Sequence, residues 1–178
     1  MPNKADKGCL LMVDDDADIR ESLGELLKAC GFRIYQADCY DAAVPILDKE
    51  KDLEAVLCDL KMPGKSGLEV LRYVNAKHKH LPLVFLTGYG TLESCQEAVR
   101  EGAFDYILKP IEDKDKVIFP LSHAVEKHRL ERKNRELQQE IIHLADEHQR
   151  IITEILEDTE IKSKVQDRIS QILDKWKA

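Results

Sequence analysis

The sequence of 178 residues contains 43% hydrophobic and 34% charged residues and carries a formal net charge of −7. This composition suits a folded domain with a packed core, excludes a disordered chain, and argues against a surface adapted to nucleic acid or anionic membranes. Because no stretch approaches the roughly 20 apolar residues that span a bilayer, and the first six residues lack a secretory signal, we expect a cytoplasmic protein with no membrane contact.

The first two thirds of the chain contain short apolar runs, and four of them are followed directly by a polar residue. These four are 9–13 before Asp14, Asp15 and Asp16; 55–58 before Asp59; 83–86 before Thr87; and 106–108 before Lys109. Runs of this length between turn residues are typical of buried strands. A fifth run, 32–37, alternates in character and predicts a less buried strand at a sheet edge.

Between these runs, apolar residues recur at helical spacing with start or stop signals. Helices are expected at 19–30 before Gly31, at 41–49 with Asp41 as N-cap, from Ser66 with Glu69 as a capping box, and from Thr91 to Gly102. Five alternations of strand and helix predict an α/β fold with a parallel sheet covered on both faces. Pro45 should be tolerated in a first turn, whereas Pro120 should kink the fifth helix or begin a new one.

The 58 residues after Pro120 contain neither glycine nor proline and predict a long helix. In a seven-residue repeat with Ile141 at position a, six of the seven d positions are apolar, the exception being Asp158. A repeat sustained this long predicts a coiled coil that needs a partner. A hairpin turning at 158–162 into an antiparallel pair is the competing arrangement. We therefore divide the chain into a domain at 8–128 and a helical coiled-coil extension at 129–178.

The polar groups that end the four strands predict a phosphoryl-transfer site. Asp14, Asp15 and Asp59 would meet at one edge of the sheet, where three carboxylates repel one another unless a cation is bound. Magnesium prefers such oxygen ligands. Lys109 would add a positive charge and Thr87 a hydroxyl donor. Such a set can hold phosphoryl oxygens while an oxygen nucleophile attacks.

Four segments together resemble the receiver domain of bacterial two-component response regulators: Val13 to Asp15, Leu57 to Gly67, Leu86 to Gly90, and Gly102 to Pro110. The resemblance covers residues 8 to 128. It implies a flavodoxin-like, doubly wound, five-stranded parallel sheet with strand order 2-1-3-4-5. It also implies that Asp59 accepts a phosphoryl group from a histidine kinase or a phosphotransfer protein.

The resemblance further implies how a cation is held. Asp15, Asp59 and the backbone carbonyl of Lys61 would bind Mg²⁺ directly, and Asp14 would bind it through water. Chemistry would be limited to magnesium-dependent self-phosphorylation and autodephosphorylation, without turnover of a separate substrate.

The same family assigns roles to four further side chains. Lys109 would pair with the phosphoryl group and Thr87 would donate to it. Tyr106 resembles the switch aromatic, which turns inward when Thr87 moves toward the phosphate. Tyr89 resembles residues that shield the phosphoryl group from water.

These expectations favour a response regulator in which phosphorylation controls output or homodimerisation through the coiled coil. Alternatively, the chain is a segment of a larger regulator whose output domain lies elsewhere. Direct DNA binding by the basic run 127–135 is disfavoured, because residues 121–178 contain eleven Lys or Arg against twelve Asp or Glu. A phosphotransfer bundle using His143 or His148, or a simple scaffold, remains an alternative from another class.

Overall fold

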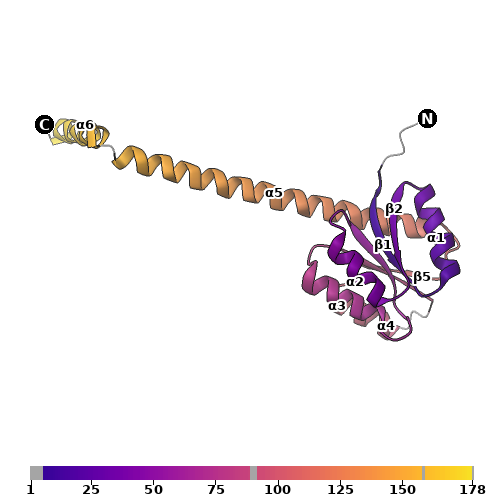
Figure 1. Cartoon of the computed structure of the whole chain (residues 1–178). Helices are drawn as coiled ribbons and strands as arrows, with labels where there is room; N and C mark the ends of the chain where they lie inside the picture. The colour runs from indigo at the N-terminus through magenta and orange to yellow at the C-terminus, as the bar shows by residue number, and fades with distance from the viewer. Residues whose placement is uncertain (1–5, 89–91, 158, 178) are drawn as a thin grey trace, which may run out of the picture. The chain divides into compact units, whose positions relative to one another are not determined.

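The computed structural model describes residues 6–88, 92–157 and 159–177 (Figure 1). In chain order, its elements are β1 (Gly8–Val13), α1 (Ala17–Ala29), β2 (Phe32–Ala37), α2 (Tyr40–Lys49), β3 (Ala55–Asp59), α3 (Gly67–Lys77), β4 (Leu83–Thr87), α4 (Leu92–Arg100), β5 (Asp105–Leu108), α5 (Asp115–Glu157) and α6 (Thr159–Lys177). The chain divides into two compact units, 1–132 and 133–178.

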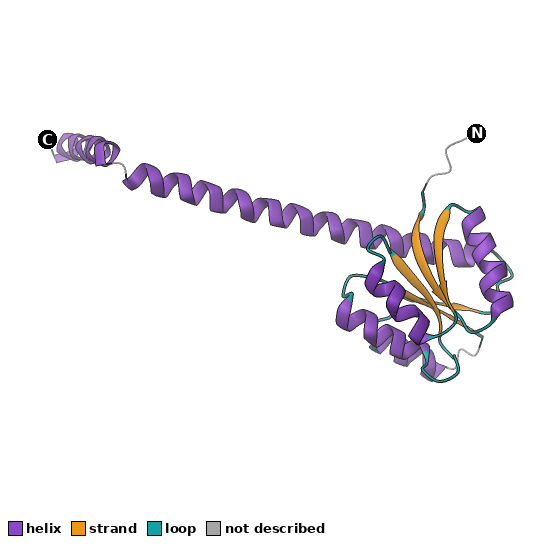
Figure 2. Ribbon diagram, in the orientation of Figure 1, coloured by secondary structure: helices purple, strands orange, loops and turns teal. Residues whose placement is uncertain are grey.

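The first unit, which we call the receiver unit, is built on a five-stranded parallel sheet with the order β2-β1-β3-β4-β5. Figure 2 shows the strands side by side with helices on both faces. The doubly wound fold and its strand order are therefore confirmed. So is the edge position of 32–37, which forms β2. Because all strands run parallel, their carboxyl ends lie along one edge of the sheet.

Alternating side chains of the central strands divide the core into two layers. On one face, Leu11 packs in a buried cluster with Leu71 of α3 and with residues of α2 and α4. On the other face, Leu10 packs with Leu27 of α1 and Leu121 of α5. This two-sided burial explains why these strands are apolar without interruption, as is typical of parallel sheets.

The start of α2 differs from the prediction. The helix begins at Tyr40 with Cys39 in extended conformation at its N-cap, so Asp41 lies in the first turn and does not cap the helix. Pro45 is consequently inside the helix. The amide that proline lacks would have bonded back to the carbonyl of residue 41, so only one bond near the helix start is lost. At α3, the capping box is confirmed, because the Ser66 amide donates to Glu69 Oε2 at 2.6 Å.

The fifth helix also differs from the prediction. It begins at Asp115 and continues through Pro120, so of the two alternatives a new helix at the proline is wrong, and a kink there stays a prediction. Val117 and Leu121, on either side of Pro120, are completely buried against the sheet. This packing stabilises the helix across the missing hydrogen bond.

The second unit consists of the outer part of α5 and α6, and the long helix predicted after Pro120 is present in these two elements. Asp158, Thr91 and Tyr89 lie outside the described residues. Among the helices that the structure describes, none is both long enough and apolar enough to cross a membrane. Pairing of the extension and the boundary near residue 129 stay predictions.

Candidate functional site

Four polar residues lie along the carboxyl edge of the sheet. Asp14 directly follows β1, Asp59 ends β3, Thr87 ends β4, and Lys109 directly follows β5. Since β1, β3, β4 and β5 are successive neighbours in the sheet, these four residues line one continuous edge. Asp14, Asp59 and Thr87 are only 1%, 7% and 1% exposed.

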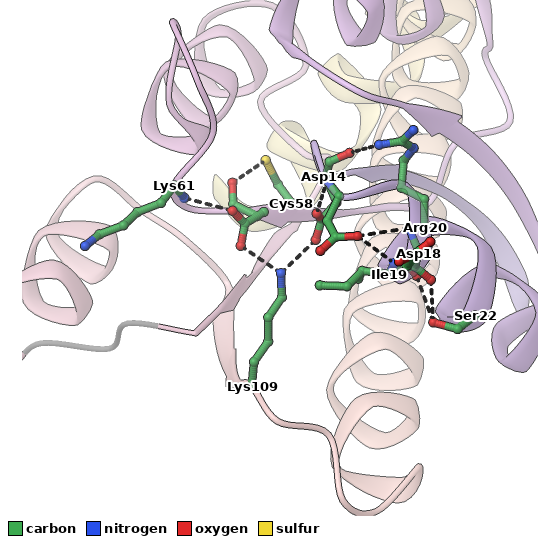
Figure 3. Close-up of polar contacts among 10 residues, drawn as sticks. Asp14, Asp18, Ile19, Arg20, Ser22, Cys58, Lys61 and Lys109 are labelled. Atoms are coloured by element: carbon green, nitrogen blue, oxygen red, sulfur yellow. Dashed lines mark hydrogen bonds and ion pairs between the residues drawn. The ribbon is translucent and has the colours of Figure 1, made fainter.

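The Lys109 ammonium joins the two carboxylates of this edge. Its Nζ lies 2.9 Å from Asp14 Oδ2 and 3.1 Å from Asp59 Oδ1. Figure 3 shows the Lys109 side chain extending toward Asp14. Residues separated by 95 and by 50 positions in the chain are thus brought into direct contact. The structure places them together as the strand-end prediction required.

Burial and charge act in opposite directions on these groups. Desolvation is the main cause that raises the pKa of Asp59, and repulsion from Asp14 adds to it, so the attraction of Lys109 does not restore the ordinary value. Burial alone would lower the pKa of Lys109, but its contacts with Asp14 and Asp59 raise it. The site therefore contains a carboxylate that is poorly solvated and only partly neutralised.

Backbone groups fix the orientation of both carboxylates. The Lys61 amide donates to Asp59 Oδ2 at 3.1 Å, and the Asp16 amide donates to Asp14 Oδ1 at 2.9 Å. Arg20 Nη1 donates to the Asp14 carbonyl at 2.6 Å (Figure 3). The sequence did not single out Arg20, although its place in the first turns of α1 puts it on the same edge of the sheet.

A close approach of two backbones positions the loop that follows Asp59. A Cβ atom on Gly67 would lie 2.2 Å from the Asp59 carbonyl oxygen, which real structures do not tolerate. The Gly67 amide instead donates to the Leu60 carbonyl at 3.1 Å. Only glycine lets the start of α3 pack directly on the end of β3.

The donor set fits a hard divalent cation. Two buried carboxylates share a single lysine, and Asp15, exposed beside Asp14, carries a third carboxylate. Oxygen donors of this kind suit Mg²⁺. Among the described residues, no three carboxylate, histidine or cysteine side chains already converge as a metal cluster. The predicted role of Asp15 and of the Lys61 carbonyl stays a prediction.

The two residues expected to act as a switch occupy different environments. Thr87 is buried, and its carbonyl accepts a hydrogen bond from the Lys109 amide at 2.8 Å, which ties β4 to the chain after β5. Tyr106, on β5, is 42% exposed, so its ring lies outward in this structure. Tyr89 lies outside the described residues.

The chain is similar in sequence to known bacterial regulatory proteins. Response regulator protein FleR of Pseudomonas aeruginosa is 34% identical over 116 residues, which cover 65% of this chain and 24% of FleR. Transcriptional regulatory protein FixJ of Azorhizobium caulinodans is 38% identical over 106 residues, covering 57% of this chain and 48% of FixJ. The chain thus spans about a quarter to a half of the length of these curated relatives.

Solved structures and the family comparison agree. A response regulator receiver domain protein from Clostridium thermocellum superposes with a TM-score of 0.65 at 27% identity, covering 69% of this chain and 98% of that one. Residues 10–118 match the family described as the response regulator receiver domain. These residues contain strands β2 to β5, β1 from Leu10 onward, and all four groups of the sheet's carboxyl edge. The chain belongs to the response regulator receiver domain family.

Proposed function

We propose that Asp59 accepts a phosphoryl group from a histidine kinase or phosphotransfer protein, and that this modification controls output through the helical extension. The observation that carries the proposal is the position of Lys109 Nζ, within 3.1 Å of both Asp14 and Asp59 at the edge where four strands end. The Lys109 ammonium can contact the oxygens of a phosphoryl group placed on Asp59, while the net negative charge of the three groups requires a divalent cation as well.

Exposure favours Asp59 over Asp14 as the acceptor, since their side chains are 9% and 2% exposed. In the transfer, an Asp59 carboxylate oxygen forms a bond to phosphorus while the bond from phosphorus to the donor histidine nitrogen breaks, and its electron pair stays on that nitrogen. Lys109 and Thr87 would offer their ammonium and hydroxyl groups to the phosphoryl oxygens.

Mg²⁺ held directly by Asp15, Asp59 and the Lys61 carbonyl, and by Asp14 through water, would neutralise charge on the phosphoryl oxygens. Without an added cation, Asp14 repels any further negative charge placed on Asp59. Acceptance of a phosphoryl group should therefore depend on a divalent cation.

Output would depend on the switch residues and on the extension. Thr87 would move toward the phosphoryl group and Tyr106, outward in this structure, would turn inward. The surface formed by α4, β5 and α5 would change as a result. We further propose that the extension pairs with a second copy of the chain, so that the receiver units act within a homodimer.

The test is incubation with acetyl phosphate and magnesium, followed by mass measurement of the intact protein and of its peptides. Wild type should gain one phosphoryl group on the peptide that contains Asp59, and Asp59→Asn should gain none. Asp146→Asn, which removes an exposed carboxylate of α5, should label as wild type does. Equal labelling of Asp59→Asn and wild type would overturn the proposal.

A further inference from the structure

The outer part of α5 carries an uncovered apolar seam. Its members, defined as the a and d positions of the seven-residue repeat from Asn134 to Ile155, include five large apolar side chains that are 43–65% exposed: Leu137, Ile141, Leu144, Ile151 and Ile155. Single exposed apolar residues need no explanation, but a row at this spacing, interrupted only by His148 at an a position, does. Helices in proteins also gain most of their stability from packing of such a face.

We infer that this seam pairs with the same seam of a second copy as a parallel, two-stranded coiled coil. The inference rests on the homodimer proposed above. It adds that the coiled coil has two helices and that they run in the same direction. Its partner is another copy of this chain, and the contact surface is the face of α5 between residues 134 and 155.

The residue types in the seam favour a coiled coil of two helices. Ile141 and Ile155 occupy a positions, while Leu137 and Leu144 occupy d positions. A β-branched residue at a with leucine at d favours a two-stranded parallel arrangement. Asn134, also at a, is the polar type that fixes register and a low oligomer state at the expense of stability. Ile151 at d is the one apolar member that departs from this pattern.

The residues that flank the seam select the direction. The g positions carry three acids, Glu140, Glu147 and Glu154. In a parallel pair, g faces e of the partner, so Glu140 meets Ala145 and Glu147 meets Ile152. No like charges meet there. The methylene groups of Glu147 can also cover Ile152, which is 51% exposed in the single chain.

An antiparallel pair would place these acids against one another. In the antiparallel register that pairs the most a and d positions, Leu137 of one copy lies opposite Ile155 of the other. The g positions of the two copies then face each other. Glu140 then meets Glu154 of the second copy, and the two copies of Glu147 meet each other. These contacts between acids at g are repulsive, whereas the parallel pair brings no two acids together, so charge disfavours the antiparallel arrangement.

Cysteine cross-linking of the full chain tests the direction. Leu137→Cys places a thiol at d, where parallel helices bring the two copies within disulfide reach, about 4–7 Å between Cα atoms. Mild oxidation should give a dimer linked from residue 137 to residue 137, located by peptide mass. Gln139→Cys, two residues away at position f on the opposite face, is the matched control and should remain unlinked.

Other outcomes would overturn the inference in distinguishable ways. A link that forms only when Leu137→Cys is mixed with Ile155→Cys would show an antiparallel pair. Equal linking of residues 137 and 139, or a monomer by sedimentation at all concentrations, would reject the seam altogether. Phosphoryl labelling of Asp59, measured on the same samples, reports on the receiver chemistry independently.

A charge-reversal mixture provides a second measurement of direction. The triple variant Glu140→Lys, Glu147→Lys, Glu154→Lys should form mixed dimers with wild type in the statistical proportion if the pair is parallel. Strong enrichment of the mixed dimer would mean that g faces g, and would overturn the parallel arrangement.

Discussion

Lys109 is the single residue on which the electrostatics of the site depend most. Its ammonium contacts Asp14 at 2.9 Å and Asp59 at 3.1 Å, and both carboxylates are buried. Lys109→Met leaves two carboxylates facing each other without a counter-charge, which we expect to lower the free energy of unfolding by about 3 kcal/mol. Urea unfolding in metal-free buffer measures this, with the exposed Lys116→Met as control. An equal loss in both variants would contradict the expectation.

Asp59 should make stability depend on pH. Because burial raises the pKa of Asp59 in the folded chain, the folded state binds a proton there more tightly than the unfolded state does. Its contribution to the free energy of unfolding is therefore largest below the ordinary carboxyl pKa and is lost as the pH rises through the raised pKa.

We expect Asp59→Asn to remove this loss, so that in metal-free buffer at neutral pH the variant unfolds at a higher temperature than wild type. Thermal unfolding followed by circular dichroism over a pH series measures the difference, with Asp146→Asn as the control that should follow wild type. Parallel pH profiles for wild type and Asp59→Asn would show that the buried carboxylate is not the cause.

At the scale of elements, α5 is attached to the sheet by one ion pair as well as by apolar packing. Arg129 Nε and Nη2 donate to the two oxygens of Glu54 at 2.6 and 2.9 Å. Glu54 directly precedes β3, is 6% exposed, and also accepts from the Cys9 amide of β1 at 3.2 Å. Paired, hydrogen-bonded charges of this kind are tolerated in a core, whereas a single unpaired one is not.

Removing one partner of this pair should therefore lower the free energy of unfolding more than removing both charges does. Arg129→Met leaves the Glu54 carboxylate buried without a counter-charge and should lower the free energy of unfolding by about 2–3 kcal/mol. Adding Glu54→Gln should recover part of the loss. Chemical denaturation of the four members of this double-mutant cycle gives the coupling, and purely additive losses would contradict the pair as described.

Local patterns predicted most of these elements, and their failures have physical causes. The apolar runs located the strands, and the alternation in 32–37 predicted an edge. The N-cap of α2 was misplaced because Cys39 caps without a side-chain acceptor, which no residue-type preference indicates. The helix through Pro120 depends on burial of Val117 and Leu121, which is a tertiary effect.

The candidate site was predictable only in part. Strand-end residues identified Asp14, Asp59, Thr87 and Lys109 because parallel strands bring such ends to one edge. Which oxygen Lys109 contacts, and how Arg20 holds the Asp14 carbonyl, depend on side-chain positions that spacing along the chain does not determine.

For the whole molecule, the two units should differ in what stabilises them. The receiver unit has two buried clusters of its own, whereas the large apolar side chains of the outer α5 are exposed. A helix without tertiary packing is marginal in water. Pairing of the extension therefore predicts that helix content falls on dilution while the near-ultraviolet signal of the receiver unit does not.

Circular dichroism across a concentration series checks this, with Ile141→Asp as the variant whose helix content should already be low at high concentration. A helix content that does not change on dilution in wild type, together with unchanged content in Ile141→Asp, would mean that the extension is stable without a partner.

The hydrogen bonds of Glu54 also connect α5 to two inner strands of the sheet. Through this one carboxylate, Arg129 of α5 is joined to the beginning of β3 and to the Cys9 amide of β1. These are neighbouring strands inside the sheet, and their opposite ends lead to Asp59 and Asp14. Arg129 of α5 is therefore connected, through Glu54, to the two inner strands that carry the acids of the candidate site, and not to a strand at the sheet's margin.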